Sequence, residues 1–268
     1  MWNWYENKTV LITGASAGIG TAMAELLAQI KTNATILLTA RRAERLTAIA
    51  EKLKKDYQTA VQTFPLDLSE HNAPQTLFDQ IQSANHDVDV LINNAGFGYK
   101  GKFLNEAYDH SRQMIQLNIT ALTSLTKLFL PGMIQRGRGG VCNVSSVLGL
   151  VSNPHVATYT ATKNFVTAFT ESLHGECKNT GVHISCLCPG LTETEFFEAA
   201  RIEVPGYAHR FMQSSQTVAT KGLKGLAKNK TIVLTHPLYS LAAFTHRHLP
   251  RRLSAWLMGL GNDGGTRG

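Results

Sequence analysis

The stretch KTVLITGASAGIG, residues 8–20, decides the fold. Its first residues are apolar and β-branched, as in a buried strand, and the residues from Gly18 onward have the composition of a helix. Gly14 permits a tight turn between them, and Gly18 and Gly20 remove Cβ atoms that would keep a pyrophosphate from the backbone and the helix N-terminus. A glycine-rich turn in this context predicts a nucleotide-binding loop.

Strand-like and helix-like stretches alternate along the rest of the chain, which predicts right-handed crossovers and a parallel sheet. We therefore expect an α/β fold: a single-domain, Rossmann-type, doubly wound parallel sheet of about seven strands with a helical C-terminal extension. Ligands bind such sheets beyond the carboxyl ends of the strands, where the strand order reverses. The expected strands are 8–13, 34–40, 60–67, 88–96, 139–146, 182–189 and 230–236, and the expected helices are 18–30, 43–57, 73–84, 157–179 and two stretches within 104–136 that meet near Asn118.

The length of 268 residues suits one α/β domain, which we place at 1–236 with a flap at 190–217, followed by a basic amphipathic extension at 237–268. The formal net charge of +7 lies wholly in residues 219–268, which hold eight Lys and Arg against one Asp. A nucleic-acid binder usually spreads its basic and aromatic residues over a reading surface, so we predict no nucleic-acid partner. The four cysteines show no C-x-x-C spacing and predict no metal site.

Three further motifs follow later strands: NNAG at 93–96, Ser145 after the fifth strand, and YTATK at 159–163. Together with the G-x-x-x-G-x-G spacing, they resemble the short-chain dehydrogenase/reductase family, over roughly residues 7–192 and in the order of that family. The stretches NNAGFGYKGKF and YTATKNFV are most similar to a bacterial-type subgroup whose members mostly have no assigned substrate. Taken singly, a Tyr and a Lys four apart are more often a surface pair, and a strand-end Ser a cap.

Tyr159 and Lys163 fall one turn apart on one helix face. A phenol has an unperturbed pKa near ~10, and a nearby ammonium lowers it, so Tyr159 is predicted to exchange a proton with a substrate carbonyl or alcohol. The resemblance implies that Lys163 also holds the nicotinamide ribose and that Ser145 hydrogen-bonds the substrate oxygen. It further implies that Asn118 holds a water linking Lys163 to solvent.

The end of the second strand bears on the choice of cofactor. NAD-specific enzymes usually carry an acidic residue there, whereas this chain has Ala40 followed by Arg41 and Arg42. Two guanidiniums suit a 2′-phosphate, so NADP(H) is favoured over NAD(H), with Arg41 preferred because Arg42 also fits a solvated residue opening the next helix. Many NADP-dependent relatives carry a basic residue where this chain has Ala17. The predicted cofactor contacts are Gly14, Ser16, Gly18, Ile19, Gly20, Arg41, Arg42, Asp67, Asn94, Ala95, Gly96, Tyr159, Lys163, Pro189, Gly190 and Thr192.

The predicted function is NADP(H)-dependent interconversion of a carbonyl and an alcohol on an apolar small molecule. Phe97 and flap aromatics such as Phe196 and Phe197 favour an apolar substrate, although they also fit residues that simply pack the flap down. A cofactor-binding regulator or scaffold without the chemistry is the alternative. The resemblance implies a homodimer or homotetramer formed through the helices that contain Asn118 and Tyr159.

The tail contains HRHLPRRLSAWLMG at 246–259, with Pro250 expected to start a new helix or a kink. Two interpretations stay open: a helix packed on its own domain or a partner subunit, or a peripheral membrane contact through 238–260 with arginines on anionic lipid. The N-terminus lacks the pattern of a secretory signal, so we expect a cytoplasmic protein, with or without that membrane contact. The apolar stripe consists of Leu249, Leu253, Trp256, Leu257 and Leu260.

Overall fold

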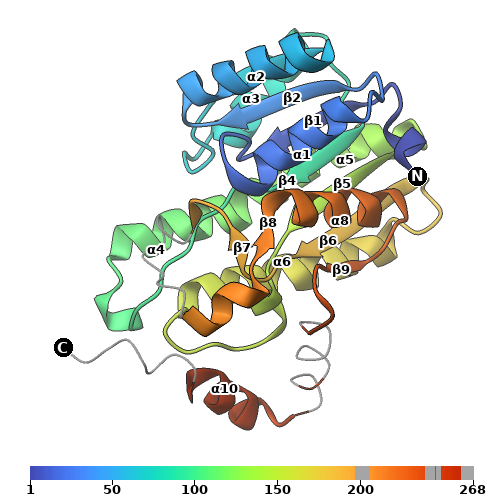
Figure 1. Ribbon diagram of the computed structural model, residues 1–268. Helices are drawn as coiled ribbons and strands as arrows, with labels where there is room; N and C mark the ends of the chain where they lie inside the picture. Colours follow the sequence, from blue (N-terminus) through green and yellow to red (C-terminus); the bar gives the residue numbers. More distant parts are fainter. Residues whose placement is uncertain (197–205, 239–244, 246–248, 261–268) are drawn as a thin grey trace.

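The computed structural model describes residues 1–196, 206–238, 245 and 249–260 (Figure 1). Within these residues, seven parallel strands form one sheet in the order β3-β2-β1-β4-β5-β6-β9, so the strand order reverses between β1 and β4. This confirms the predicted doubly wound sheet. The strands are β1 (Thr9–Thr13), β2 (Thr35–Ala40), β3 (Val61–Pro65), β4 (Val90–Asn93), β5 (Gly139–Val144), β6 (Val182–Cys188) and β9 (Ile232–Leu234).

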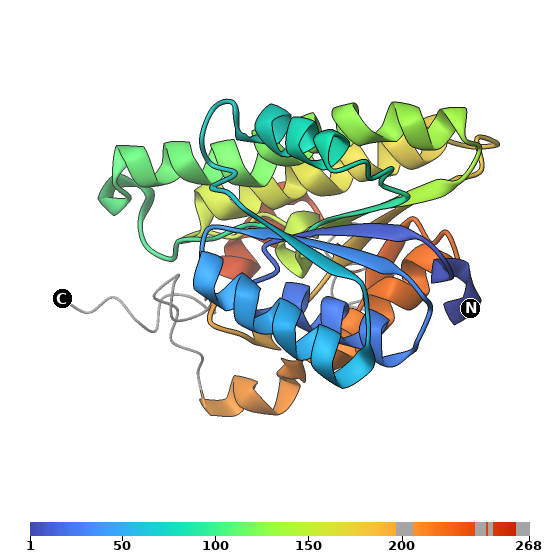
Figure 2. The same cartoon turned by 90° about the horizontal axis from the view of Figure 1, so that it is seen from above.

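Helices cover both faces of the sheet, with α1, α2 and α8 on one side and α3, α4, α5 and α6 on the other (Figure 2). Along β1, Val10 and Ile12 pack into the first layer and Leu11 into the second, which is why the three central residues of the strand are all apolar. The helices are α1 (Gly18–Gln29), α2 (Ala43–Tyr57), α3 (Ala73–Ser83), α4 (Tyr108–Ile115), α5 (Leu122–Gln135), α6 (Ala157–Glu176) and α8 (Ser215–Ala227), with short 3-10 helices at Trp2–Tyr5, Phe103–Asn105, Val147–Leu150 and Gly206–Phe211.

The two stretches predicted to meet near Asn118 form one continuous helical run. A π-helical turn, Gln116–Ala121, joins α4 to α5, and the dihedral angles stay helical through both junctions. Such a turn holds one extra residue and changes the direction of the side chains that follow. The junction is therefore a widened turn inside a helix, with Asn118 fully buried at its centre.

The run Tyr108–Gln135 is also long and apolar enough to cross a membrane, judged by length and composition over the described residues alone. Its apolar residues, including Leu125, Phe129 and Met133, pack into the core beneath the sheet. A helix in the core of a globular domain satisfies the same criteria of length and composition. The burial of these side chains is typical of such a core helix.

The flap contains a small pairing that the sequence did not predict. The two-residue strand β7 (Thr192–Glu193) runs parallel to β8 (Gln213–Ser214), outside the seven expected strands. Ser215 Oγ donates to the carbonyl oxygen of Glu193 at 2.7 Å, so the two ends of the flap are fastened together where α8 begins. Phe197 lies outside the described residues.

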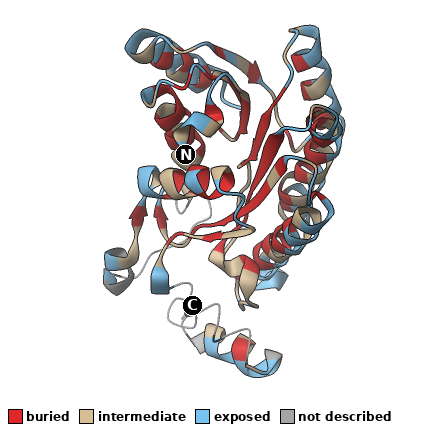
Figure 3. Ribbon diagram, turned by 90° about the vertical axis from the view of Figure 1, so that its right-hand side faces the viewer, coloured by how far each residue is buried: buried red, intermediate tan, exposed pale blue. Residues whose placement is uncertain are grey.

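Helix α10 (Arg251–Leu260) begins directly after Pro250, where a new helix was predicted, and lies at the edge of the molecule (Figures 1 and 3). A Cβ built on Gly259 would lie 3.4 Å from Pro154, so the helix rests on the loop before α6. Residues 239–244 of the extension lie outside the described part of the chain. The outward face of α10 carries Leu253, Trp256 and Leu257, which are 41%, 58% and 41% exposed.

Candidate active site

The glycine-rich turn leaves β1 and enters α1 where the strand order reverses. Gly14 and Gly18 have φ angles of 64° and 57°, which residues with a Cβ rarely adopt. A Cβ on Gly18 would lie 2.9 Å from Cγ2 of Thr194, and one on Gly20 would lie 2.5 Å from the carbonyl oxygen of Gly14. The absent Cβ of Gly20 therefore allows α1 to pack against the turn, in addition to its predicted role in the approach of a pyrophosphate.

Asn94 fastens this turn to the neighbouring strand. Its Nδ2 donates to the carbonyl oxygens of Thr13 at 2.9 Å and Gly14 at 3.2 Å. The backbone N–H groups of Asn94 and Ala95 both donate to Oγ1 of Thr13 at 2.9 Å. The NNAG motif therefore holds the sheet together at the reversal point.

A cavity of about 620 Å³ opens beyond the carboxyl ends of the strands, as the topology predicts. The loops after β2 and β3 line one end, and the residues after β5 and on α6 line the other. Of the predicted site residues, Gly20 and Asn118 lie outside this lining. Those within it are Gly14, Ser16, Gly18, Ile19, Arg41, Arg42, Asp67, Asn94, Ala95, Gly96, Ser145, Tyr159, Lys163, Pro189, Gly190 and Thr192.

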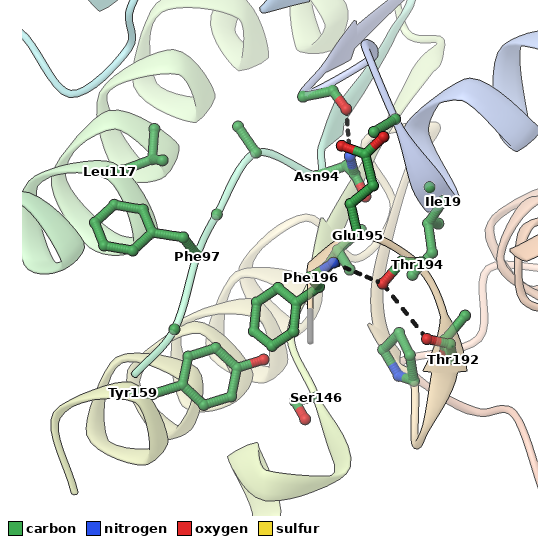
Figure 4. Close-up of a pocket in the computed structure, with 18 of the residues that line it drawn as sticks. Ile19, Asn94, Phe97, Leu117, Ser146, Tyr159, Thr192, Thr194, Glu195 and Phe196 are labelled. Carbon is green, nitrogen blue, oxygen red and sulfur yellow. Dashed lines mark hydrogen bonds between the residues drawn. The ribbon is translucent and has the colours of Figure 1, made fainter. Parts of the chain in front are cut away.

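The two adjacent serines after β5 point in different directions. Ser146 lies beside the phenol of Tyr159 and acts to lower its pKa, and both side chains face the cavity (Figure 4). Oγ of Ser145 instead lies 2.8 Å from both the carbonyl oxygen of Lys163 and Oγ1 of Thr167. Ser145 was predicted to bond the substrate oxygen, but Ser146 is the serine whose side chain lies beside the phenol, because consecutive residues at a strand end face opposite sides. The doublet SS was the only signal in the sequence.

Burial governs the ionisation of Tyr159 and Lys163. It raises the pKa of Tyr159 to about 12, while the hydrogen bond from Ser146 acts in the opposite direction. Burial also lowers the pKa of Lys163 to about 8. We predicted that the ammonium would lower the pKa of Tyr159, but Nζ of Lys163 lies 5.7 Å from the ring centroid and donates to the carbonyl oxygen of Val144 at 2.9 Å. The phenol therefore keeps its proton at neutral pH.

Asn118 connects the π-helical turn to the NNAG loop and to α6. Its Nδ2 donates to the carbonyl oxygen of Phe97 at 3.0 Å and to Oγ1 of Thr162 at 3.1 Å, and its Oδ1 accepts from the N–H of Phe97 at 3.2 Å. A Cβ on Gly96 would lie 2.9 Å from Oδ1 of Asn118 and 3.4 Å from Nζ of Lys163. Gly96 thus leaves the space in which Asn118 and Lys163 come close.

At the opposite end of the cavity, Arg41 and Arg42 diverge. Arg41 is 68% exposed, and its Nη1 lies 3.6 Å from Oδ2 of Asp67. Arg42 turns back toward the glycine-rich turn, with Nε and Nη2 at 3.3 Å and 3.2 Å from Oγ of Ser16. The sequence favoured Arg41, but Arg42 is the guanidinium that faces the nucleotide-binding loop.

The flap crosses the cavity above Tyr159. The ring of Phe196 lies 5.5 Å from the ring of Tyr159, centroid to centroid, and both line the cavity (Figure 4). A Cβ on Gly98 would lie 2.8 Å from Cζ of Phe196, so the flap and the NNAG loop meet here. Thr192 Oγ1 donates to the carbonyl oxygen of Gly190 at 3.0 Å, which stabilises the start of the flap.

The lining suits a nicotinamide dinucleotide: two glycines at positive φ border it, a guanidinium lies at one end, and a buried Tyr–Lys pair lies at the other. A family model described as short chain dehydrogenase matches residues 8–204. The chain belongs to the short-chain dehydrogenase family. Members of this family are oxidoreductases, so the cavity is that of a nicotinamide-dependent oxidoreductase.

Known short-chain dehydrogenases resemble this chain over nearly its whole length. A dehydrogenase/reductase SDR family protein 7-like from Drosophila melanogaster is 30% identical over 275 residues, covering 96% of this chain and 81% of the relative. A short-chain dehydrogenase from Sphingobium yanoikuyae in complex with NADPH superposes with a TM-score of 0.80 at 28% identity, covering 97% of this chain and 98% of the other. A relative from Burkholderia phymatum in complex with NAD gives 0.79 at 25% identity, covering 90% and 92%.

Proposed function

We propose that this protein is an NADP(H)-dependent oxidoreductase that interconverts a carbonyl and an alcohol on an apolar small molecule. The observation that carries the proposal is one continuous cavity with Ser146, Tyr159 and Lys163 at one end and Arg42 with Ser16 at the other. The first group offers a proton donor for a substrate oxygen, and the second offers a cationic site for a phosphate.

Tyr159 is the general acid in reduction and the general base in oxidation. When bound, the nicotinamide supplies or accepts the hydride at the substrate carbon. Because burial keeps the phenol protonated at neutral pH, Tyr159 can donate its proton to the carbonyl oxygen while Ser146 hydrogen-bonds that oxygen. Lys163, with a pKa of about 8, then restores the proton, and in this proposal the nearby Asn118 holds a water that links the buried Lys163 to solvent.

The adenosine end favours NADP(H). β2 ends at Ala40, so no carboxylate at that position opposes a 2′-phosphate, and Arg42 with Ser16 offers it donors. In this proposal Asp67 borders the adenine, Lys163 also holds the nicotinamide ribose, and Arg41 adds positive charge. The remaining contacts are Gly14, Gly18, Ile19, Asn94, Ala95 and Gly96 along the dinucleotide and Pro189, Gly190 and Thr192 near the nicotinamide.

The substrate end is apolar. Phe97, Leu117, Val147 and Phe196 line the cavity around the phenol of Tyr159. Such a wall favours a hydrocarbon-rich ketone or alcohol with few charged groups, because each buried charge without a partner is costly.

A panel of apolar ketones and alcohols tests the proposal with NADPH, NADH and their oxidised forms. We expect turnover with NADPH to exceed turnover with NADH, and Tyr159→Phe to lower kcat by about 10²–10⁴-fold while NADPH still binds. Unchanged turnover in Tyr159→Phe would refute the catalytic assignment. NADPH binding without turnover of any compound in the wild-type protein would favour a regulatory or scaffold role.

We propose assembly into a homodimer or homotetramer through α4, α5 and α6. Ile115 on α4 and Phe165 on α6 are 45% and 42% exposed although both are large and apolar, and Phe165 stacks on Phe169 with ring centroids 6.1 Å apart. A second copy of the chain would cover this surface.

We also propose that α10 brings a cytoplasmic enzyme to an anionic lipid surface. Its outward face carries Leu253, Trp256 and Leu257, and no acidic residue occurs in the sequence between Glu203 and Asp263. An exposed apolar face within a basic segment suits the boundary of a bilayer with acidic headgroups.

Vesicle sedimentation tests the α10 proposal. We expect the wild-type protein to sediment with phosphatidylserine-containing vesicles and not with neutral ones, and a variant with Leu253→Ser, Trp256→Ser and Leu257→Ser to remain in solution. Equal sedimentation of both proteins would contradict it. Loss of oligomers in the variant, with no lipid binding by either protein, would assign the face to a second copy instead.

A further inference from the structure

One carboxylate connects the flap to the adenosine end of the cavity. Glu195 places Oε2 2.8 Å from Nη1 of Arg42 and Oε1 2.5 Å from Nη1 of Arg45. Arg42 immediately precedes α2, and Arg45 lies in its first turn. The two guanidiniums hold the pKa of Glu195 below its ordinary value, so the carboxylate is charged at neutral pH.

The same guanidinium is the one that faces the nucleotide-binding loop. Arg42 uses Nε and Nη2 toward Ser16 and Nη1 toward Glu195. An anion held by two arginines beside a glycine-rich turn is the arrangement that also binds a phosphate. A 2′-phosphate arriving at Arg42 would therefore meet a carboxylate of the same sign already bound there.

The residue after Glu195 lies over the catalytic end of the cavity. The ring of Phe196 lies 5.5 Å from the ring of Tyr159 at an interplanar angle of 49°, and the N–H of Phe196 donates to Oγ1 of Thr194 at 3.3 Å (Figure 4). Because Glu195 and Phe196 are consecutive, the ion pair with Arg42 helps to determine where the Phe196 ring lies.

We propose that Glu195 is a latch that the 2′-phosphate of NADP(H) displaces from Arg42 and Arg45, and that this release moves Phe196 away from Tyr159. The inference rests on the proposed preference for NADP(H) and adds a residue that sets it. NAD(H) has no 2′-phosphate and leaves the latch closed, so only the phosphorylated cofactor prepares the site for substrate. The side chains of Arg42 and Glu195 are 44% and 48% exposed, and such an ion pair is weak enough for a phosphate to displace.

Binding of half-cofactors to the full-length protein tests the latch without turnover. Adenosine 2′,5′-bisphosphate carries the 2′-phosphate but no nicotinamide, and 5′-AMP lacks the 2′-phosphate. We expect Glu195→Gln to bind the bisphosphate about three- to tenfold more tightly than wild type in calorimetry, since the competing carboxylate is gone. Glu193→Gln, which removes the same charge two residues away, should bind like wild type, and 5′-AMP should bind all three proteins equally.

Hydrogen exchange over residues 192–196 provides the second measurement. The bisphosphate occupies only the adenosine end, so any effect on Phe196 must pass through the latch. We expect the bisphosphate to speed hydrogen exchange of these residues in wild type and 5′-AMP to leave it unchanged. In Glu195→Gln, the same residues should exchange fast even without ligand.

Equal or weaker bisphosphate binding by Glu195→Gln would overturn the latch while leaving the proposed cofactor preference intact, and so would unchanged exchange in wild type. If wild type bound the bisphosphate no better than 5′-AMP, the preference for NADP(H) would itself be wrong and the latch would be wrong with it.

Discussion

The side chain of Ser146 lies beside the phenol of Tyr159, whereas Ser145, its immediate neighbour, donates a hydrogen bond to the backbone of the helix that carries that phenol. The two serines thus divide two tasks. One faces the substrate end of the cavity, and the other anchors α6 to the end of β5. This division makes them a matched pair for mutation.

Ser146→Ala should lower kcat by about 10²-fold or more with little change in stability, because in the proposed mechanism it removes the hydrogen-bond donor to the substrate oxygen. Ser145→Ala should keep kcat within a few-fold and lower the free energy of unfolding by about 1–2 kcal/mol, because it removes buried hydrogen bonds. Steady-state kinetics at saturating NADPH and urea unfolding measure both effects. The reverse pattern would restore Ser145 as the residue that bonds the substrate.

The lowered pKa of Lys163 predicts a dependence of stability on pH. With a folded pKa of about 8 and an ordinary value of 10.5, the unfolded chain binds more protons between these values, so the contribution of Lys163 to stability rises with pH. Between pH 7.5 and 9.5, wild type should gain about 2 kcal/mol relative to Lys163→Met in urea unfolding of the cofactor-free protein. A constant difference between the two proteins would mean that Lys163 titrates normally.

Arg42→Ala should raise the Kd for NADPH by roughly 10- to 100-fold and leave the Kd for NADH nearly unchanged, because charge-assisted hydrogen bonds to the 2′-phosphate are lost. Arg41→Ala is the matched control and should have a smaller effect, since its guanidinium points to Asp67. Fluorescence titration measures the Kd of wild type and of each variant for NADPH and for NADH. A larger effect for Arg41→Ala would reverse the assignment of the two arginines.

Phe165→Asp should convert the proposed oligomer to a monomer that keeps its fold, because a carboxylate would be buried without a partner between copies. Phe103→Asp is the control: Phe103 is 63% exposed on a different element and should leave the assembly unchanged. Size-exclusion chromatography with light scattering reports the mass, and circular dichroism reports the fold. An oligomer that persists in Phe165→Asp would place the interface elsewhere.

Most of the fold could be predicted because each strand and helix has a recognisable pattern in its own local sequence. Every observed strand of the main sheet lies within its predicted range, since buried parallel strands form short apolar runs bounded by turns. The ends of the strands were predicted less accurately. Strand β4 stops at Asn93, three residues before the predicted end, because Asn94 turns to bond Thr13 and Gly14. The π-helical turn at Gln116–Ala121 has no signature in the sequence, since its residues also suit an ordinary helix.

The sequence by itself determined the order of the elements, the glycine-rich turn at the strand-order reversal, and the placement of Tyr159 one turn from Lys163, because these follow from spacing along one element. Only the tertiary structure decided that Ser146 rather than Ser145 meets Tyr159, and that Arg42 turns toward Ser16. It also decided that burial, not the neighbouring charge, sets the protonation of the phenol. Side-chain direction at a strand end and desolvation depend on neighbours distant in the chain, which no local pattern records.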